Sequence, residues 1–154
     1  MGDHRLRSVS IDPESLAAAS TELEHDREVA VADLLEQNSF RPEGAGGGPY
    51  HLRISCRENR LAFEVEGPSY ARAHILALSP LKRSIRDYMM ICASYDEAIR
   101  EASPSRIEGV DMGRRGLHDE AARLLQERLA GKIETDLDTA RRLFTLICAL
   151  HRRG

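Results

Sequence analysis

Residues 51–66 constrain the fold more than any other part of this 154-residue chain, because two short runs alternate between apolar and polar side chains around Glu58-Asn59. A period of two places all the apolar side chains of a strand on one face. Two such strands joined by a short turn form an antiparallel hairpin whose polar face can pair Arg with Glu. The other face must be covered by further elements. Its apolar set is Leu52, Ile54, Cys56, Leu61, Phe63 and Val65.

Further strands are expected on both sides of this hairpin. The turn Gly67-Pro68-Ser69 leads into a third strand at His74–Leu78. An alternating run at Arg5–Ile11 predicts another strand near the N-terminus, which Asp12-Pro13 ends before a short turn through Ser15–Ser20. We therefore expect a small antiparallel sheet of three or four strands with one polar face.

Helical signals occupy the rest of the chain. A capping box at Thr21 and Glu24 opens an acidic helix that should end near Asn38. Ser79-Pro80 opens a long helix that should end at Ala102, before Ser103-Pro104. A last helix, at Asp138–Arg153, is apolar nearly all round in its middle, which is typical of a central core helix.

These elements predict an α+β fold, with the small sheet packed against four or five helices in one domain. Within residues 1–154 we expect a strand and an acidic helix over 1–40, a Gly-rich loop over 41–49, antiparallel strands over 50–79 and a helical part over 80–154. The length suits a single continuous core.

The densest local signal is the stretch Pro104–Leu129. Apolar residues at helical spacing lie on both sides of Gly113-Arg114-Arg115-Gly116, and glycine accepts the positive φ that a tight turn needs. The pattern predicts a short helix, a basic turn and a second helix that reaches Leu129, with Gly131 as its C-cap.

The leading functional hypothesis places a binding site at this turn. We expect a non-catalytic interaction or adaptor module whose partner is another protein and whose site contains Asp111, Gly113, Arg114, Arg115, Gly116 and His118. The purely structural alternative is a tight connection in which Arg114 or Arg115 pairs with carboxylates such as Asp111, Asp119 or Glu120.

Two other functions remain open. A helix–Gly-x-x-Gly–helix unit with basic residues imitates the loop by which KH domains clamp a nucleic-acid backbone, so RNA or another phosphate ligand is the runner-up. An enzyme would use His118 with Asp119 or Glu120 as acid–base groups, but consecutive helical residues point about 100° apart, and the sequence offers no evident nucleophile. No cofactor is implied, and no two histidines share a metal-ligand spacing.

The net charge and the cysteines limit which functions and which cell compartment the sequence suggests. The net charge of −3 argues against a polyanion binder, although residues 1–40 alone carry nine acids and three arginines. Three widely spaced cysteines, each in an apolar pattern, indicate buried free thiols in a reducing cytoplasm. No apolar run approaches the ~18–20 residues that span a bilayer, and the N-terminus lacks a secretory signal, so we expect a cytoplasmic protein without membrane contact.

Several runs together resemble an uncharacterised alphaproteobacterial family, uncharacterised protein family 0262. The main ones are Ile107–His118, Gly131-Lys132-Ile133 and Asp138–Cys148, and the similarity reaches upstream through Asn38–Pro42 and Glu24-His25. It covers nearly the whole chain, but the family has no assigned activity to carry over. The resemblance implies a bacterial, cytoplasmic, single-domain protein. His151-Arg152 departs from the aromatic–basic pair expected there, which leaves no role to carry over for the extreme C-terminus.

Overall fold

The computed structural model describes residues 3–15 and 21–151, over which the chain forms four α-helices, two sheets and one 3-10 turn. The elements are β1 (Leu6–Ile11), η1 (Pro13–Ser15), α1 (Thr21–Glu36), β2 (Phe40–Pro42), β3 (Tyr50–Arg57), β4 (Arg60–Gly67), β5 (Tyr70–Ala77), α2 (Ser79–Arg100), α3 (Pro104–Leu129), β6 (Ile133–Thr135) and α4 (Leu137–His151). The α+β prediction is confirmed. Most of the turn expected through Ser15–Ser20 lies outside the described residues.

The main sheet has the strand order β1-β3-β4-β5. Its β3–β4 hairpin is the predicted one, and Glu58 and Asn59 take the positive φ values that a tight hairpin turn needs. One prediction was wrong: β1 runs parallel to β3, so the sheet is mixed. The chain passes through α1 and β2 between these strands, and a crossover of that length permits parallel pairing. A second sheet pairs β2 with β6.

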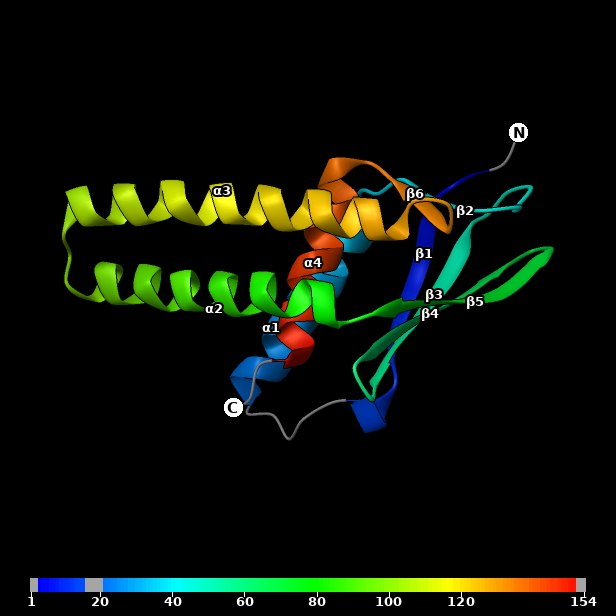
Figure 1. Cartoon of the computed structure of the whole chain (residues 1–154), viewed down its shortest axis with the longest axis horizontal. Coiled ribbons are helices and arrows are strands. Elements are labelled where there is room, and N and C mark those ends of the chain that lie inside the picture. Colours follow the sequence, from blue (N-terminus) through cyan, green and yellow to red (C-terminus); the bar gives the residue numbers. More distant parts are fainter. Residues whose placement is uncertain (1–2, 16–20, 152–154) are drawn as a thin grey trace.

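One continuous core lies between the main sheet and the helices. The inner face of the sheet contributes Leu52, Ile54 and Phe63, and α4 contributes nine buried residues, including Phe144. In Figure 1, α1 and α4 lie side by side next to the sheet, and α2 and α3 form an antiparallel pair that extends away from it. No helix among the described residues is both long and apolar enough to cross a membrane.

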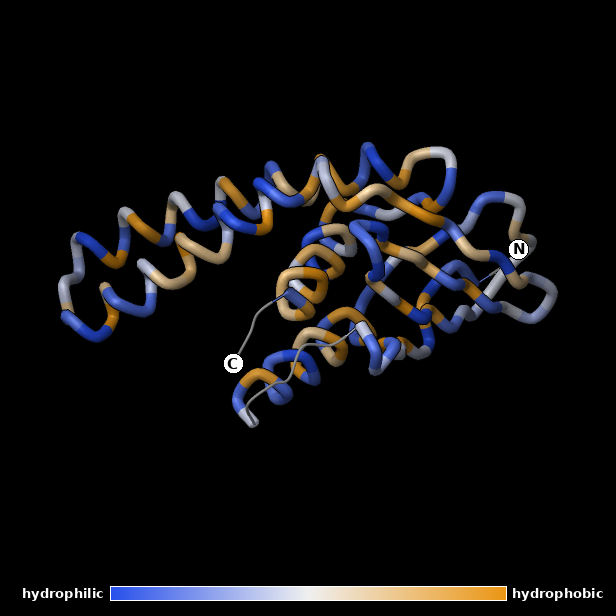
Figure 2. Tube along the Cα trace, turned by 60° about the horizontal axis from the view of Figure 1, so that its bottom comes forward, coloured by the Kyte–Doolittle hydropathy of each residue, from blue (hydrophilic) through white to orange (hydrophobic). Residues whose placement is uncertain are grey.

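The α2–α3 hairpin leaves the body of the protein (Figure 2). No residue is buried over 86–97 of α2 or over 104–120 of α3. The two helices are joined by three residues, of which Ala102 has φ 54°, and Pro104 then occupies the first turn of α3. This connection agrees with the predicted end of α2.

The predicted turn at Gly113–Gly116 is wrong, because α3 runs without a break from Pro104 to Leu129. A glycine inside a helix costs only about 1 kcal/mol relative to alanine, and only proline breaks a helix outright. α3 has no proline after its first residue, and ion pairs from Asp111 to Arg114 and Arg115 link neighbouring turns. Packing along α2 stabilises the helix further. A Cβ on Gly113 would lie 2.9 Å from Ile91 Cδ1, so this glycine lets the two helices approach closely.

Candidate functional site

A groove lies where the hairpin leaves the body, between α2 and α3 on one side and α1 and α4 on the other. Its volume is about 580 Å³, which is within the range of ligand and side-chain binding sites. We call it the hairpin groove. Its apolar residues are Val29, Ala30, Met89, Ala93, Cys148 and Ala149. Its polar residues are Asp26, Tyr88, Cys92, Asp96, Arg114 and Thr145.

Three of these residues follow directly from the periodicity of α2. Tyr88, Cys92 and Asp96 are spaced by four, so they form one row along the helix. Tyr88 and Cys92 are half-buried, and Asp96 is exposed. Asp96 continues the row of Tyr88 and Cys92, and a charged residue at this position indicates that the face of α2 is open to solvent beyond the body.

Arg114 is held at the groove by two contacts. Its Nη2 donates to Asp111 Oδ1 at 2.6 Å, and its guanidinium carbon lies 4.2 Å from the centre of the Tyr95 ring. Arg115 also pairs with Asp111, at 2.8 Å, but its side chain is 77% exposed. The predicted pairing with Asp111 is therefore present for both arginines, and only Arg114 lines the groove.

His118 lies behind the groove instead of in it. Its ring stacks on Tyr88 with centroids 4.9 Å apart, and it also contacts the Phe144 ring. Its Nε2 lies 3.0 Å from the Arg141 carbonyl oxygen, so the neutral imidazole with a proton on Nε2 ties α3 to α4. Burial lowers the pKa of His118, a shift that the hydrogen bond to Arg141 partly opposes.

The neighbouring groups share the same environment. Burial raises the pKa of Tyr88, and the nearby Cys92 thiol raises it further. Thr145 Oγ1 donates to the Arg141 carbonyl oxygen and lies 3.0 Å from His118 Nε2. Asp119, the acid–base neighbour proposed from sequence, instead pairs with Arg141. The polar contacts of His118 therefore join α3 to α4.

The structure separates the six residues predicted as one site. Arg114 lines the hairpin groove and Asp111 holds it there, whereas Gly113 serves the packing of α2 on α3. Arg115 and Gly116 are exposed on α3. The groove residues missed from sequence are on α1, α2 and α4, since the approach of these helices depends on how they cross.

Exposed acidic side chains run along α1, and one of them, Asp26, lines the groove. All six acids of α1 are exposed, whereas its one arginine, Arg27, is 6% exposed and donates from Nε to the Ala149 carbonyl oxygen on α4. The acidic character predicted for residues 1–40 is thus presented to solvent along this helix. The acids are Glu22, Glu24, Asp26, Glu28, Asp33 and Glu36.

Comparison with known proteins identifies the family. The model of the uncharacterised protein family UPF0262 matches residues 3–153. Similar relatives are the UPF0262 protein PHZ_c2197 of Phenylobacterium zucineum, with 65% identity over 98% of this chain and 95% of the relative, and the UPF0262 protein of Caulobacter vibrioides, with 60% identity over 99% and 96%. A Brucella canis relative is 56% identical over 97% of this chain and 95% of its own length. No solved structure gives a significant match. The chain belongs to the family UPF0262.

Proposed function

We propose that this chain is a non-catalytic interaction module that docks one amphipathic helix of a partner protein in the hairpin groove. The observation that carries the proposal is an apolar floor left open between helices, with acidic groups on two of its walls. Val29 on α1 is 43% exposed, and Met90, which adjoins the groove on α2, is 64% exposed. Methionine adapts to differently shaped apolar side chains, which suits a helix-binding surface.

Charge along α2 supports the orientation of this helix. Asp96 on α2 and Asp26 on α1 both line the groove, and the charge of Arg114 is offset in part by Asp111, which also pairs with Arg115. Toward the body, the same face of α2 continues past Met89 into a second hollow flanked by Lys82 and Arg86. A docked helix would therefore place basic residues at Asp26 and Asp96 and acidic residues at the other end. Residues 82–96 extend for about 21 Å, which corresponds to about four helical turns of the partner.

RNA or phosphate binding has weaker support. The Gly-x-x-Gly turn on which it depended is helical, and both arginines are paired with Asp111. His118, the acid–base candidate, does not line the groove, and its Nε2 contacts the Arg141 carbonyl oxygen. These observations favour the protein-docking function over both alternatives.

The test is site-specific photocrosslinking in Caulobacter vibrioides, whose relative is 60% identical. A photoreactive residue replaces Ala93 in the groove, and a control places it at Glu127, which is exposed on α3 and does not line the groove. We expect a ribonuclease-resistant protein adduct at Ala93 alone, mapped by mass spectrometry to an amphipathic segment with a basic end. An adduct that disappears with ribonuclease, or equal adducts at both positions, would overturn the proposal.

A charge variant sharpens this experiment. Asp96→Lys should lower the Ala93 adduct about tenfold, which corresponds to about 1.4 kcal/mol, because it repels the basic end of the partner helix. Asp33→Lys makes the same charge change on an exposed position of α1 that does not line the groove and should leave the adduct unchanged. Equal losses in both variants would mean that only the overall charge matters.

A further inference from the structure

The two edge strands of the main sheet, β1 and β5, differ in how their outer backbone groups are hydrogen-bonded. On β1, the register shifts between Leu6 and Ser8, and the Asn38 side chain accepts from the Leu6 N–H at 2.7 Å and donates to its carbonyl oxygen at 3.3 Å. β5, at the other edge, pairs with β4 over eight residues without a bulge. Within residues 3–15 and 21–151, no hydrogen bond reaches the backbone of β5 on its outer side. Such a row of unpaired N–H and C=O groups is a template for another strand.

The side chains of β5 leave this edge accessible. Ala71, Ala73, Ile75 and Ala77 lie on the outer face, and Ile75 is 55% exposed. Arg72 is the one charged residue of β5, and neither a proline nor a bulge interrupts the strand. Edge strands that stay unpaired in other proteins usually carry charged side chains, a proline or a bulge. The edge of β5 therefore fits an incoming strand along its whole length.

Charges on β4 indicate which strand fits. On the outer face, Arg60 lies beside Ala77 at one end of β5, and Glu66 lies beside Ala71 at the other end. Neither Arg60 nor Glu66 forms an ion pair with another described residue. If β5 of a second molecule pairs antiparallel with this β5, the end of the strand beside Arg60 in each molecule meets the end beside Glu66 in the other. This pattern is complementary to itself under a two-fold rotation.

We propose that β5 pairs with β5 of a second copy of this chain, so that two four-stranded sheets join into one of eight strands. The two-fold axis passes near Ala73 and Ile75, because antiparallel pairing places the middle of each strand opposite the middle of the other. The interface consists of one strand and its flanking charges, which is at the small end of specific interfaces. We expect a micromolar dissociation constant. This surface lies on the sheet edge and is independent of the hairpin groove.

Sedimentation equilibrium from about 1 to 200 µM protein tests the dimer. We expect a reversible monomer–dimer equilibrium that Ala73→Lys shifts to monomer, by at least about a tenfold weaker association. The matched control is Ser10→Lys, which places the same charge on an exposed position of β1, the other edge strand. Circular dichroism checks that both variants stay folded. A monomer at all concentrations, or a dimer equally insensitive to both variants, would overturn the proposal.

Disulfide trapping tests the arrangement without depending on a disruptive variant. Cysteine is introduced singly at Ala71, Ala73, Ile75 or Ala77, and dimer formation under mild oxidation is compared with the wild-type chain. With Ala77 opposite Ala71 of the other copy, the two-fold antiparallel pairing places Ala73 opposite Ile75. A mixture of the Ala71→Cys and Ala77→Cys chains, or of the Ala73→Cys and Ile75→Cys chains, should therefore crosslink more strongly than any of the four chains alone. Self-crosslinking of the single chains as strong as crosslinking of the two mixtures would contradict this antiparallel interface.

Discussion

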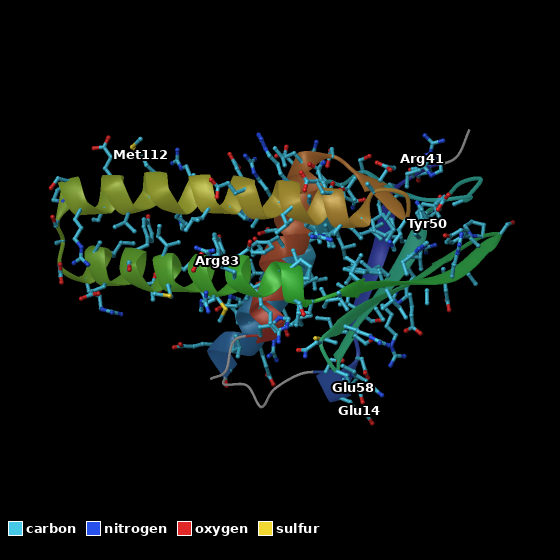
Figure 3. All side chains as sticks on the ribbon, in the orientation of Figure 1. Glu14, Arg41, Tyr50, Glu58, Arg83 and Met112 are labelled. Atoms are coloured by element: carbon cyan, nitrogen blue, oxygen red, sulfur yellow. The ribbon has the colours of Figure 1, made fainter. Side chains whose placement is uncertain are left out.

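The body of this protein and its α2–α3 hairpin are stabilised by different kinds of interaction. Nine of the 15 residues of α4 are buried, compared with three of the 22 residues of α2. The body is held by close apolar packing, while the hairpin beyond it depends on ion pairs, on Gly113 and on half-buried side chains such as Tyr95. Figure 3 shows Met112 pointing away from α2, and this side chain is 68% exposed. A partner can therefore bind near the hairpin without disturbing the core.

The largest expected effect compares an apolar residue of each region. Phe144→Ala removes a fully buried ring that packs against Tyr88 and His118, and we expect a loss of about 3–5 kcal/mol in the free energy of unfolding. Met112→Ala in the hairpin should change it by less than about 0.5 kcal/mol, because little apolar surface is buried there. Urea denaturation measures both variants. Similar losses would show that the hairpin is packed as tightly as the body.

A pH titration probes one histidine of each region. Burial lowers the pKa of His74 on β5 and of His118 at the root of the hairpin from an ordinary value of 6.5. Each histidine therefore binds its proton more readily in the unfolded chain. Its stabilising contribution is complete above pH 6.5 and is lost as the pH falls toward the folded-state pKa, with a slope of at most about 1.4 kcal/mol per pH unit and per histidine.

Unfolding free energies between pH 7.5 and 5.5 measure this slope. His118→Gln should reduce it and leave the contribution of His74, and the double variant with His74→Gln should flatten it further. A slope that His118→Gln leaves unchanged would show that His118 titrates alike in the folded and unfolded chain.

Replacing the glycines of α3 by alanine should change the free energy of unfolding by a smaller amount, and the sign of the change shows whether the glycines are helical. Gly116 is helical and a Cβ there meets open space, so Gly116→Ala should raise the unfolding free energy by about 0.5–1 kcal/mol. Gly113→Ala should gain less, because Ile91 must rotate away from the new Cβ. If both variants were destabilised by more than about 1 kcal/mol, positive φ and a turn at these glycines would be indicated instead.

A comparison of similar size separates the two arginines. Arg115→Ala should change stability by less than about 0.5 kcal/mol, since its pair with Asp111 is largely solvated. Arg114→Ala should cost about 1 kcal/mol, because it also removes the contact with the Tyr95 ring. Thermal and urea unfolding of the two variants make the comparison. Equal effects would mean that the position of Arg114 at the groove contributes nothing to the hairpin.

Local patterns predicted much of the fold correctly. The β3–β4 hairpin follows from strict alternation and from two residues that tolerate positive φ, and the starts of α1 and α2 follow from Thr21 and Ser79-Pro80. Local patterns failed at Gly113–Gly116, because a glycine's preference for turns is worth only about 1 kcal/mol and packing against α2 outweighs it. They also missed the direction of β1, since its partner strand lies about forty residues away in the chain.

The sequence by itself determined the family, the α+β class, the acidic surface of α1 and the ion pairs of Asp111 with its neighbours, because each depends on composition or on residues a few positions apart. Only the tertiary structure decided which of the candidate residues share a site. Arg114 meets Asp26 and Thr145 at one groove because α2 and α3 pack across α1 and α4, and that crossing depends on the shapes of buried side chains distributed over the whole chain.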